Sequence, residues 1–156
     1  MKLKKYLTIN KKGKTPAFYL KKSTNSLSKN IINLIKIFSI KNKTDSRICL
    51  HASTKDKIQL MLNSLIKKKE GYHYNYHPYT DEYYYIISGK LLVFYYEKKI
   101  KKKLTLSKGS IEIFKLKKKT LHVTIPLTRN CVFLEIRQGP FNPKKDAIFT
   151  KQFEKI

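Results

Sequence analysis

Residues 71–91, GYHYNYHPYTDEYYYIISGKL, decide the fold. Two short runs rich in Tyr and Ile, 72–77 and 82–88, flank the segment 78–81, and Gly89 follows the second run. Aromatic and β-branched residues in runs of this length are typical of strands, whereas Pro, Asp and Gly are typical of turns. The stretch therefore predicts two consecutive β-strands, which we expect to pair as a hairpin.

Similar runs lie on both sides of this stretch: SRICLH (46–51), KLLVFYYE (90–97), SIEIF (110–114), LHVTIPL (121–127) and CVFLEIR (131–137). The segment DKIQLMLNSLI (56–66) fits a helix or a strand by periodicity, and a strand is favoured because its neighbours are strands. Short strands at close spacing, without a βαβ alternation, predict a sandwich or barrel. Residues 46–156 are therefore predicted to form a single all-β domain.

The first 45 residues differ in composition from the rest of the chain. Residues 1–44 contain twelve lysines and no acidic residue. TPAFYLKK (15–22) predicts a short strand, with Pro16 suited to an edge. Ser26 or Ser28 provides an N-cap for a helix over residues 27–40, whose apolar residues recur at helical spacing. Residues 1–45 are thus predicted to be an extension with one helix, which packs on the barrel.

The formal net charge of +25 raises the question of a nucleic-acid partner. The basic residues are nearly all lysines, and only three arginines are present. Arginine is the residue preferred for forked contacts with phosphates and bases. Many lysines also stand in short runs at predicted turns (67–69, 98–103 and 117–119). We therefore expect no specific nucleic-acid partner, only nonspecific binding to polyanions at low salt.

The sequence also bears on location and redox state. No apolar run approaches the roughly 20 residues that span a bilayer, and the basic start lacks the apolar stretch of a signal peptide. These features predict a cytoplasmic protein without a membrane span. Cys49 and Cys131 make neither a disulfide framework nor a CxxC metal pattern, so we expect two free thiols. The sequence leaves open whether the chain forms a homodimer.

A carboxylate and a histidine flank the turn of the central stretch. Across a hairpin, His77 and Glu82 would face each other. Strand pleating places Glu82, Tyr84 and Ile86 on one face. A carboxylate among large apolar residues is costly to bury unpaired, and a metal ion or a histidine partner would remove that cost. The spacing therefore favours a metal site at His77 and Glu82.

His122, in LHVTIPL, is a third candidate ligand. Two histidines and one carboxylate on a rigid β-scaffold suit Zn²⁺, Fe²⁺, Mn²⁺ or Ni²⁺ and leave open positions on the ion. His73 shares the predicted face of His77 but lies four residues away at about 3.3 Å per residue, too far along a regular strand to bind the same ion. For each histidine taken alone, an ordinary hydrogen-bonding role remains the alternative.

The central stretch resembles the first motif of the cupin superfamily, which has a His-x-His pair, a glutamate a few residues later and a glycine beyond it. His77, Glu82 and Gly89 match the second histidine, the glutamate and the closing glycine, and Asn75 stands at the first histidine. His122 resembles the single histidine of the second motif. That motif's usual Pro and Gly positions are lysines here, Lys117 and Lys119.

The resemblance is closer to the WbuC-type cupin fold metalloproteins, found among bacterial O-antigen and surface-polysaccharide genes. It covers residues from about Ser46 to the C-terminus in three blocks. The central stretch and His122 carry the metal residues, and two other blocks match at Arg47, Cys49, His51, Glu135, Gly139, Pro140 and Phe141. The resemblance implies a cupin-type β-barrel (a jelly roll) whose metal ligands are His77, Glu82 and His122. Asn75, which departs from the motif, is a weak candidate ligand through its carbonyl oxygen.

The function that the resemblance implies is action on a sugar or sugar nucleotide in surface-polysaccharide biosynthesis, with an undefined reaction and a small-molecule substrate. A non-enzymatic carbohydrate- or ligand-binding barrel is the alternative, and Asn75 favours it. A basic nucleic-acid-binding protein is a further alternative, favoured only by charge. Whether the protein is an enzyme stays open.

Four polar residues interrupt apolar strand patterns and are candidates for substrate contacts at the barrel mouth: Arg47, His51, Glu135 and Arg137. Tyr84 is a fifth candidate because it shares the face of Glu82. Glu135 has an equal alternative as a simple partner of Arg137 or of a lysine at the surface. His51 is a candidate general base, as is Tyr84 if its pKa were lowered.

Overall fold

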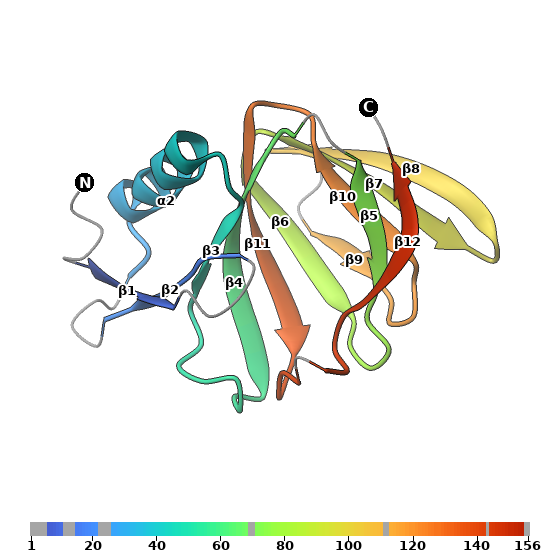
Figure 1. Cartoon of the computed structure of the whole chain (residues 1–156), viewed down its shortest axis with the longest axis horizontal. Helices are drawn as coiled ribbons and strands as arrows, with labels where there is room; N and C mark the ends of the chain where they lie inside the picture. Colours follow the sequence, from blue (N-terminus) through green and yellow to red (C-terminus); the bar gives the residue numbers. More distant parts are fainter. Residues whose placement is uncertain are drawn as a thin grey trace.

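Two β-sheets face each other in the computed structural model, which describes residues 6–10, 15–21, 26–68, 71–110, 113–142 and 144–154 (Figure 1). The long sheet has the order β1 (Leu7–Asn10), β2 (Ala17–Leu20), β3 (Ser46–Cys49), β4 (Ile58–Ile66), β11 (Asn130–Gln138), β6 (Glu82–Ser88) and β9 (Phe114–Leu116). The short sheet has the order β12 (Ile148–Glu154), β5 (Tyr72–Tyr76), β10 (His122–Pro126), β7 (Lys90–Glu97) and β8 (Ile100–Ser107). The predicted all-β barrel is confirmed.

Helix α2 (Lys29–Asn42) covers the outer face of the long sheet (Figure 1). Ser28 is its N-cap, because the Ser28 hydroxyl accepts a hydrogen bond from the backbone N–H of Ile31. Ile31 and Ile35 pack against buried side chains from the strands beneath: Leu7, Phe18, Ile48, Leu62 and Val132. The predicted helix is confirmed, with both ends two residues later than expected.

The N-terminal strands belong to the long sheet. β1 pairs with β2 antiparallel, and β2 pairs with β3 parallel. The strand predicted from TPAFYLKK is therefore present as β2. The sheet is continuous from β2 to β3, and a domain boundary at residue 45 stays a prediction.

The barrel interior is filled by the inward faces of both sheets. The long sheet contributes Tyr84, Ile86, Leu116, Cys131 and Phe133, and the short sheet contributes Leu91, Val93 and Leu106. These side chains are almost fully buried, and together they hold the sheets face to face. Both cysteines are buried and free, as predicted. Among the described residues, no helix is long and apolar enough to cross a membrane.

The predicted hairpin of β5 and β6 is wrong. β5 pairs with β10 and β12 in the short sheet, whereas β6 pairs with β11 and β9 in the long sheet. The segment between them, residues 77–81, crosses from one sheet to the other. Two strands joined by a short turn give the same sequence pattern in a hairpin and in a crossing between sheets, so pattern alone did not separate the two.

Other differences concern lysine-rich and terminal segments. The run 98–103 was expected at a turn, but only Lys98 and Lys99 form it, with φ of 49° and 68°. Residues 101–103 lie in β8, an edge strand, where exposed lysines oppose further strand pairing. Strands β1 and β12 were not predicted, whereas the strand over 56–66 is confirmed as β4. In the predicted strand 110–114, residues 111 and 112 lie outside the described part.

Candidate metal centre

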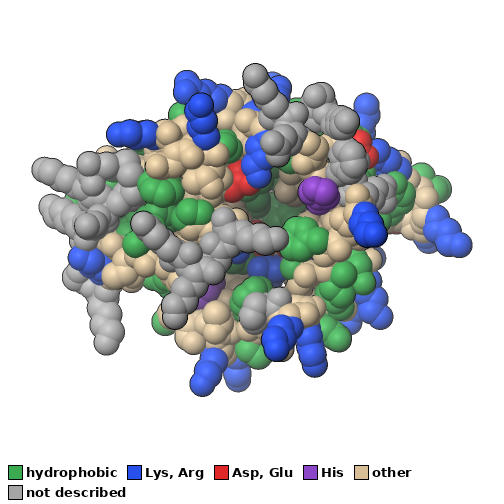
Figure 2. Space-filling view, in the orientation of Figure 1, with side chains coloured by type: hydrophobic (Ala, Val, Ile, Leu, Met, Phe, Trp, Pro, Cys, Tyr) green, Lys and Arg blue, Asp and Glu red, His purple; other side chains and the backbone are tan. Residues whose placement is uncertain are grey.

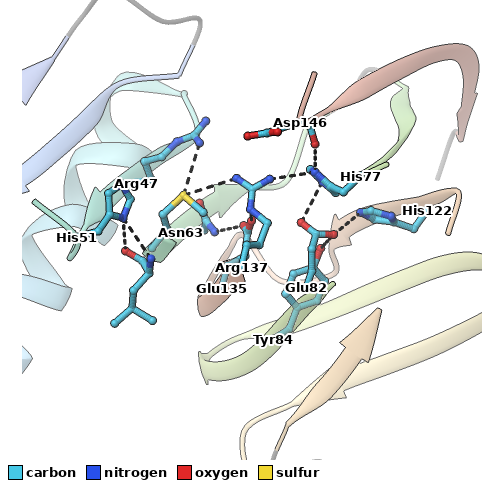
Figure 3. Close-up of polar contacts among 12 residues, drawn as sticks. Arg47, His51, Asn63, His77, Glu82, Tyr84, His122, Glu135, Arg137 and Asp146 are labelled. Carbon is cyan, nitrogen blue, oxygen red and sulfur yellow. Dashed lines mark hydrogen bonds and ion pairs between the residues drawn. The ribbon is translucent and has the colours of Figure 1, made fainter. Parts of the chain in front are cut away.

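Two histidines converge on one carboxylate between the sheets. His77 Nε2 lies 3.0 Å from Glu82 Oε1, and His122 Nε2 lies 3.1 Å from Glu82 Oε2 (Figure 3). One candidate ligand atom from each residue lies within 4.8 Å of the others. All three side chains are buried, with exposed fractions of 6%, 3% and 3%. The three residues could hold a metal ion, and we call them the triad.

Both sheets contribute to the triad. Glu82 is the first residue of β6 in the long sheet, and His122 is the first residue of β10 in the short sheet. His77 follows the last residue of β5 and begins the crossing segment. Its carbonyl oxygen accepts a hydrogen bond from the N–H of Lys119, 2.7 Å away. The crossing that replaces the hairpin therefore brings His77 to Glu82.

Backbone carbonyl groups hold the outer nitrogen of each histidine. Nδ1 of His122 lies 2.9 Å from the carbonyl oxygen of Thr120, and Nδ1 of His77 contacts the carbonyl oxygen of Asp146. Where Nδ1 donates to its carbonyl oxygen, Nε2 of the neutral imidazole carries the lone pair. Both Nε2 atoms face the Glu82 carboxylate, so in that tautomer each lone pair would be available to a cation shared with Glu82, the arrangement found where histidines bind a metal.

His77 has a second arrangement available. Nη1 of Arg137 lies 3.0 Å from His77 Nδ1, on the same side as the Asp146 carbonyl group. If Nδ1 accepts from Arg137, Nε2 carries the proton and donates to Glu82. The first tautomer presents a lone pair to a cation, and the second satisfies Glu82 without one.

Electrostatics favour an ionised Glu82. Burial acts to raise the pKa of Glu82, but hydrogen bonds from His122 and His77 outweigh it and hold the pKa well below its ordinary value. Burial acts to lower the pKa of His122, but its contact with the Glu82 carboxylate outweighs this and raises the pKa. Without a cation, the triad is therefore held by a carboxylate–imidazolium pair.

Tyr84 donates a hydrogen bond from its hydroxyl group to Glu82 Oε2 over 3.1 Å. The expected position on the face of Glu82 is thus observed. Burial, followed by the charges of Glu82 and Glu135, raises the pKa of Tyr84 well above its ordinary value. The suggestion of Tyr84 as a general base required a lowered pKa and is wrong, because its surroundings are apolar and negatively charged. Tyr84 acts here as a donor that orients the carboxylate.

The remaining residues of the first motif lie beside the triad. Asn75 is half-buried and stands opposite His122 in the β5–β10 pair. His73 is exposed and is not part of the cluster formed by the described residues, as its distance along a regular strand predicted.

A row of polar contacts continues from the triad along the inner face of the long sheet (Figure 3). Arg137 Nε lies 2.9 Å from Glu135 Oε1, and Asn63 donates to Glu135 Oε2 over 2.6 Å. Burial raises the pKa of Glu135, although Arg137 counteracts this. Glu135 therefore pairs with Arg137, but the pair is largely buried rather than at the surface, where such a pair was expected. At the end of the row, Met61 Sδ lies 4.0 Å from Arg137 Nη2 and 3.9 Å from Arg47 Nη1.

A large cavity opens beside this row, and the space-filling view shows that face hollowed between the sheets (Figure 2). Its volume is about 1050 Å³, and the residues around it include Arg47, Cys49, His51, Met61, Asn75 and Arg137. The triad itself does not line it. The cavity reaches the triad at two places, through Asn75 beside His122 and through Arg137 beside His77.

Three of the five predicted substrate contacts therefore line the cavity: Arg47, His51 and Arg137. Tyr84 and Glu135 do not, since both are enclosed between the sheets and engaged with Glu82 and Arg137. Burial lowers the pKa of His51, which keeps its imidazole neutral near pH 7. A neutral imidazole at the cavity wall is able to accept a proton.

Sequence reasoning missed several residues of the site. The Asp146 carbonyl group that holds His77 has no sequence signal, because any residue supplies a carbonyl oxygen. Met61 and Asn63 were assigned only to an apolar strand. Met61 stands opposite Glu135 and Asn63 opposite Phe133 in the β4–β11 pair, a register that the sequence alone does not give.

No protein-family model matches the sequence, and a search of curated proteins finds no similar sequence. Solved structures do resemble the fold. The capsular polysaccharide assembling protein CapF from Staphylococcus aureus aligns with a TM-score of 0.52 and 18% identity, over 61% of this chain and 27% of CapF. A CapF structure with the inhibitor 3-isopropenyl-tropolone aligns with a TM-score of 0.56 and 15% identity, over 70% and 32% of the two chains.

Oxalate decarboxylase from Bacillus subtilis, studied for its Mn(II) centres, aligns with a TM-score of 0.50 and 19% identity, over 60% of this chain and 24% of the enzyme. This chain thus spans a quarter to a third of the length of these structures. At such identities the likeness establishes the fold alone. The neighbours are cupin-superfamily proteins, and the fold is a cupin-type β-barrel, as the resemblance implied.

Proposed function

We propose that the protein is a metal-binding cupin in which His77, Glu82 and His122 hold one divalent transition-metal ion. The observation that supports this most is the orientation of the histidines, because Nδ1 of each contacts a backbone carbonyl group while Nε2 of each faces Glu82. Nitrogen and carboxylate donors suit Zn, Fe, Mn or Ni. Asn75 or water would fill the remaining positions.

The proposed role is action on a small molecule, a sugar or sugar nucleotide, in bacterial O-antigen or surface-polysaccharide biosynthesis in the cytoplasm. The WbuC-type resemblance of three sequence blocks supports it, and so does the likeness in fold to the CapF proteins, one described as assembling capsular polysaccharide. Cupin barrels host many reactions, so the fold supports the class of site rather than a particular reaction.

In this proposal, the residues at the triad and around the cavity have different roles. A bound ion supplies Lewis-acid polarisation of a substrate oxygen. Tyr84 and the two backbone carbonyl groups orient the ligands, and Arg137 lies against His77. His51, neutral at the cavity wall, is the candidate to accept a proton from the substrate.

Metal content measured on protein purified without chelator tests the proposal. We expect close to one transition-metal ion per chain. Glu82→Gln should lose most of the ion, because it removes the carboxylate charge at the centre. Asp81→Asn is the matched control, since it removes a neighbouring charge that pairs with Lys115 outside the triad. Equal metal content in both variants, or none in the parent, would show that the triad is not a metal site.

A non-enzymatic ligand-binding barrel is the second candidate, and Asn75 supports it. A cupin that has lost one imidazole ligand binds its ion more weakly, and the cavity of about 1050 Å³ would still accept a carbohydrate. Glycan or sugar-nucleotide binding that is unchanged after metal removal would favour this candidate over the first.

A further inference from the structure

Arg47 has no ion-pair partner among the described residues. The side chain is half-buried on the inner face of the long sheet, where it lines the cavity. Its Nη1 donates weakly to the Met61 sulfur atom, and its buried Nε has no hydrogen-bond partner. Within the described part of the chain, no carboxylate forms an ion pair with it. A guanidinium group carries five N–H donors, and leaving them unsatisfied away from water costs free energy.

Arg137 lines the same cavity but contacts several partners. It has Glu135 as its ion-pair partner, contacts His77, and lies over the ring of Phe141 at 5.8 Å. Its contacts fix it between the cavity and the triad. Of the two arginines that line the cavity, Arg47 is therefore the one without an ion-pair partner among the described residues.

The charge of the region also points to an anion. The row from Arg47 to the triad contains two arginines and two carboxylates, Glu82 and Glu135, whose charges cancel when both carboxylates are ionised and both histidines of the triad are neutral. A divalent ion in the triad would leave two positive charges. Burial raises the pKa of Glu135, and any protonation of Glu135 makes this excess larger.

We propose that Arg47 binds an anionic group of the ligand, a phosphate or a carboxylate, in the cavity beside the triad. This inference rests on the proposed function in taking the cavity as the ligand site. A planar guanidinium group binds either anion through two parallel hydrogen bonds. The ligand class is then an anionic sugar derivative, either a sugar nucleotide, which carries a diphosphate, or a sugar acid, and a neutral sugar is excluded.

Calorimetric titration of the full chain tests this, with pyrophosphate and UDP as phosphate probes, glucuronate as the carboxylate probe and glucose as the neutral comparison. The ionic strength is kept at about 0.15 M so that exposed charges are screened. Arg47→Gln should weaken the preferred anion roughly 10- to 100-fold, as expected for loss of hydrogen bonds to a charged group. Arg47→Lys keeps the charge but cannot form two parallel hydrogen bonds, so its affinity for the anion should lie between those of the parent and of Arg47→Gln.

Arg129→Gln is the matched control, because Arg129 is an exposed arginine outside the cavity and its loss changes the net charge equally. Tighter binding of pyrophosphate and UDP identifies a phosphate ligand, and tighter binding of glucuronate identifies a sugar acid. If no anion binds, if glucose binds equally well, or if Arg47 and Arg129 variants behave alike, the inference is overturned. Thermal melting of each variant separates loss of binding from loss of folding.

Each titration is run on chelator-treated and on metal-loaded protein, with metal content measured in parallel. Arg47→Gln should leave metal content unchanged, since Arg47 has no contact with the triad. If the protein binds metal but the Arg47 variants bind anions as the parent does, only this inference is overturned. Anion binding through Arg47 in a chain that holds no metal overturns the metal proposal alone.

Discussion

Asn75 lies directly opposite His122 across the antiparallel pair of β5 and β10. Opposite residues of such a pair project to the same face, so the Asn75 side chain stands beside a ligand of the triad. Asn75→His should raise the affinity for Zn²⁺ or Ni²⁺, because imidazole is a better donor than a carboxamide. Competition with a chromogenic chelator measures the change.

His73→Ala is the control for this substitution. His73 lies on β5 two residues before Asn75 and outside the triad, so its loss should leave metal affinity unchanged. If the His73 variant loses metal, or if Asn75→His gains none, the position opposite His122 does not border a metal centre.

Metal binding should stabilise the fold and weaken as the pH falls. An ion at 100 times its dissociation constant adds about 2.7 kcal/mol to the free energy of unfolding. The ligand histidines bind the ion only when neutral at Nε2, so protons compete. Because the pKa of His122 is raised above 6.5, this competition begins above the pH at which a free histidine titrates.

Melting temperatures with and without Zn²⁺, measured across this pH range, provide the test. The metal-induced increase should be largest at neutral pH and should disappear on acidification. Glu82→Gln should show no metal-induced increase at any pH. An increase that is independent of pH, or equal in the parent and in Glu82→Gln, would place the ion elsewhere.

Gly89→Ala should destabilise the fold more than Gly109→Ala. Both glycines have positive φ, 83° and 78°, so an alanine at either costs about 1–2 kcal/mol in backbone conformation. At Gly89, an added Cβ would also meet the carbonyl oxygen of Asn130 at 2.5 Å, whereas at Gly109 nothing lies within 4 Å. The steric contact should add about 1–3 kcal/mol. Urea denaturation of the two variants measures the difference, and equal values would contradict the close approach of Gly89 to β11.

Both thiols should react slowly in the native protein. Burial raises the pKa of Cys131 to about 12, and it also raises the pKa of Cys49. Since the thiolate is the reactive form, a thiol reagent at mildly alkaline pH should modify neither until denaturant is added. Two equivalents should then react. Rapid modification of native Cys131 would show that the barrel interior opens more readily than its packing indicates.

The sequence predicts individual strands better than their partners. β4, β6, β7, β10 and β11 were all expected from Ile, Val, Tyr and Phe, because burial selects these residues. β8 was missed because its lysines are typical of exposed loops, and an edge strand tolerates them equally well. The pairing of β5 and β6 was wrong because a short connection does not encode whether the chain stays in its sheet.

The triad was predicted even though the hairpin that suggested it does not exist. His77 and Glu82 meet because the crossing segment turns between the sheets, and the spacing of five residues serves this geometry as well as a hairpin. The contacts of Arg47 and Arg137 with Met61 required the register of β3, β4 and β11, which no local pattern reveals.

The chain leaves the triad at Glu82 and returns to it at His122, so residues 82–122 form a loop that is closed at its base. β6, β7, β8 and β9 all lie within that loop. A loop whose ends are tied has less conformational freedom to gain on opening than a free segment of equal length. The contact between Glu82 and His122 therefore adds a side-chain closure to a segment whose strands are already tied by the β6–β9 and β7–β10 pairs.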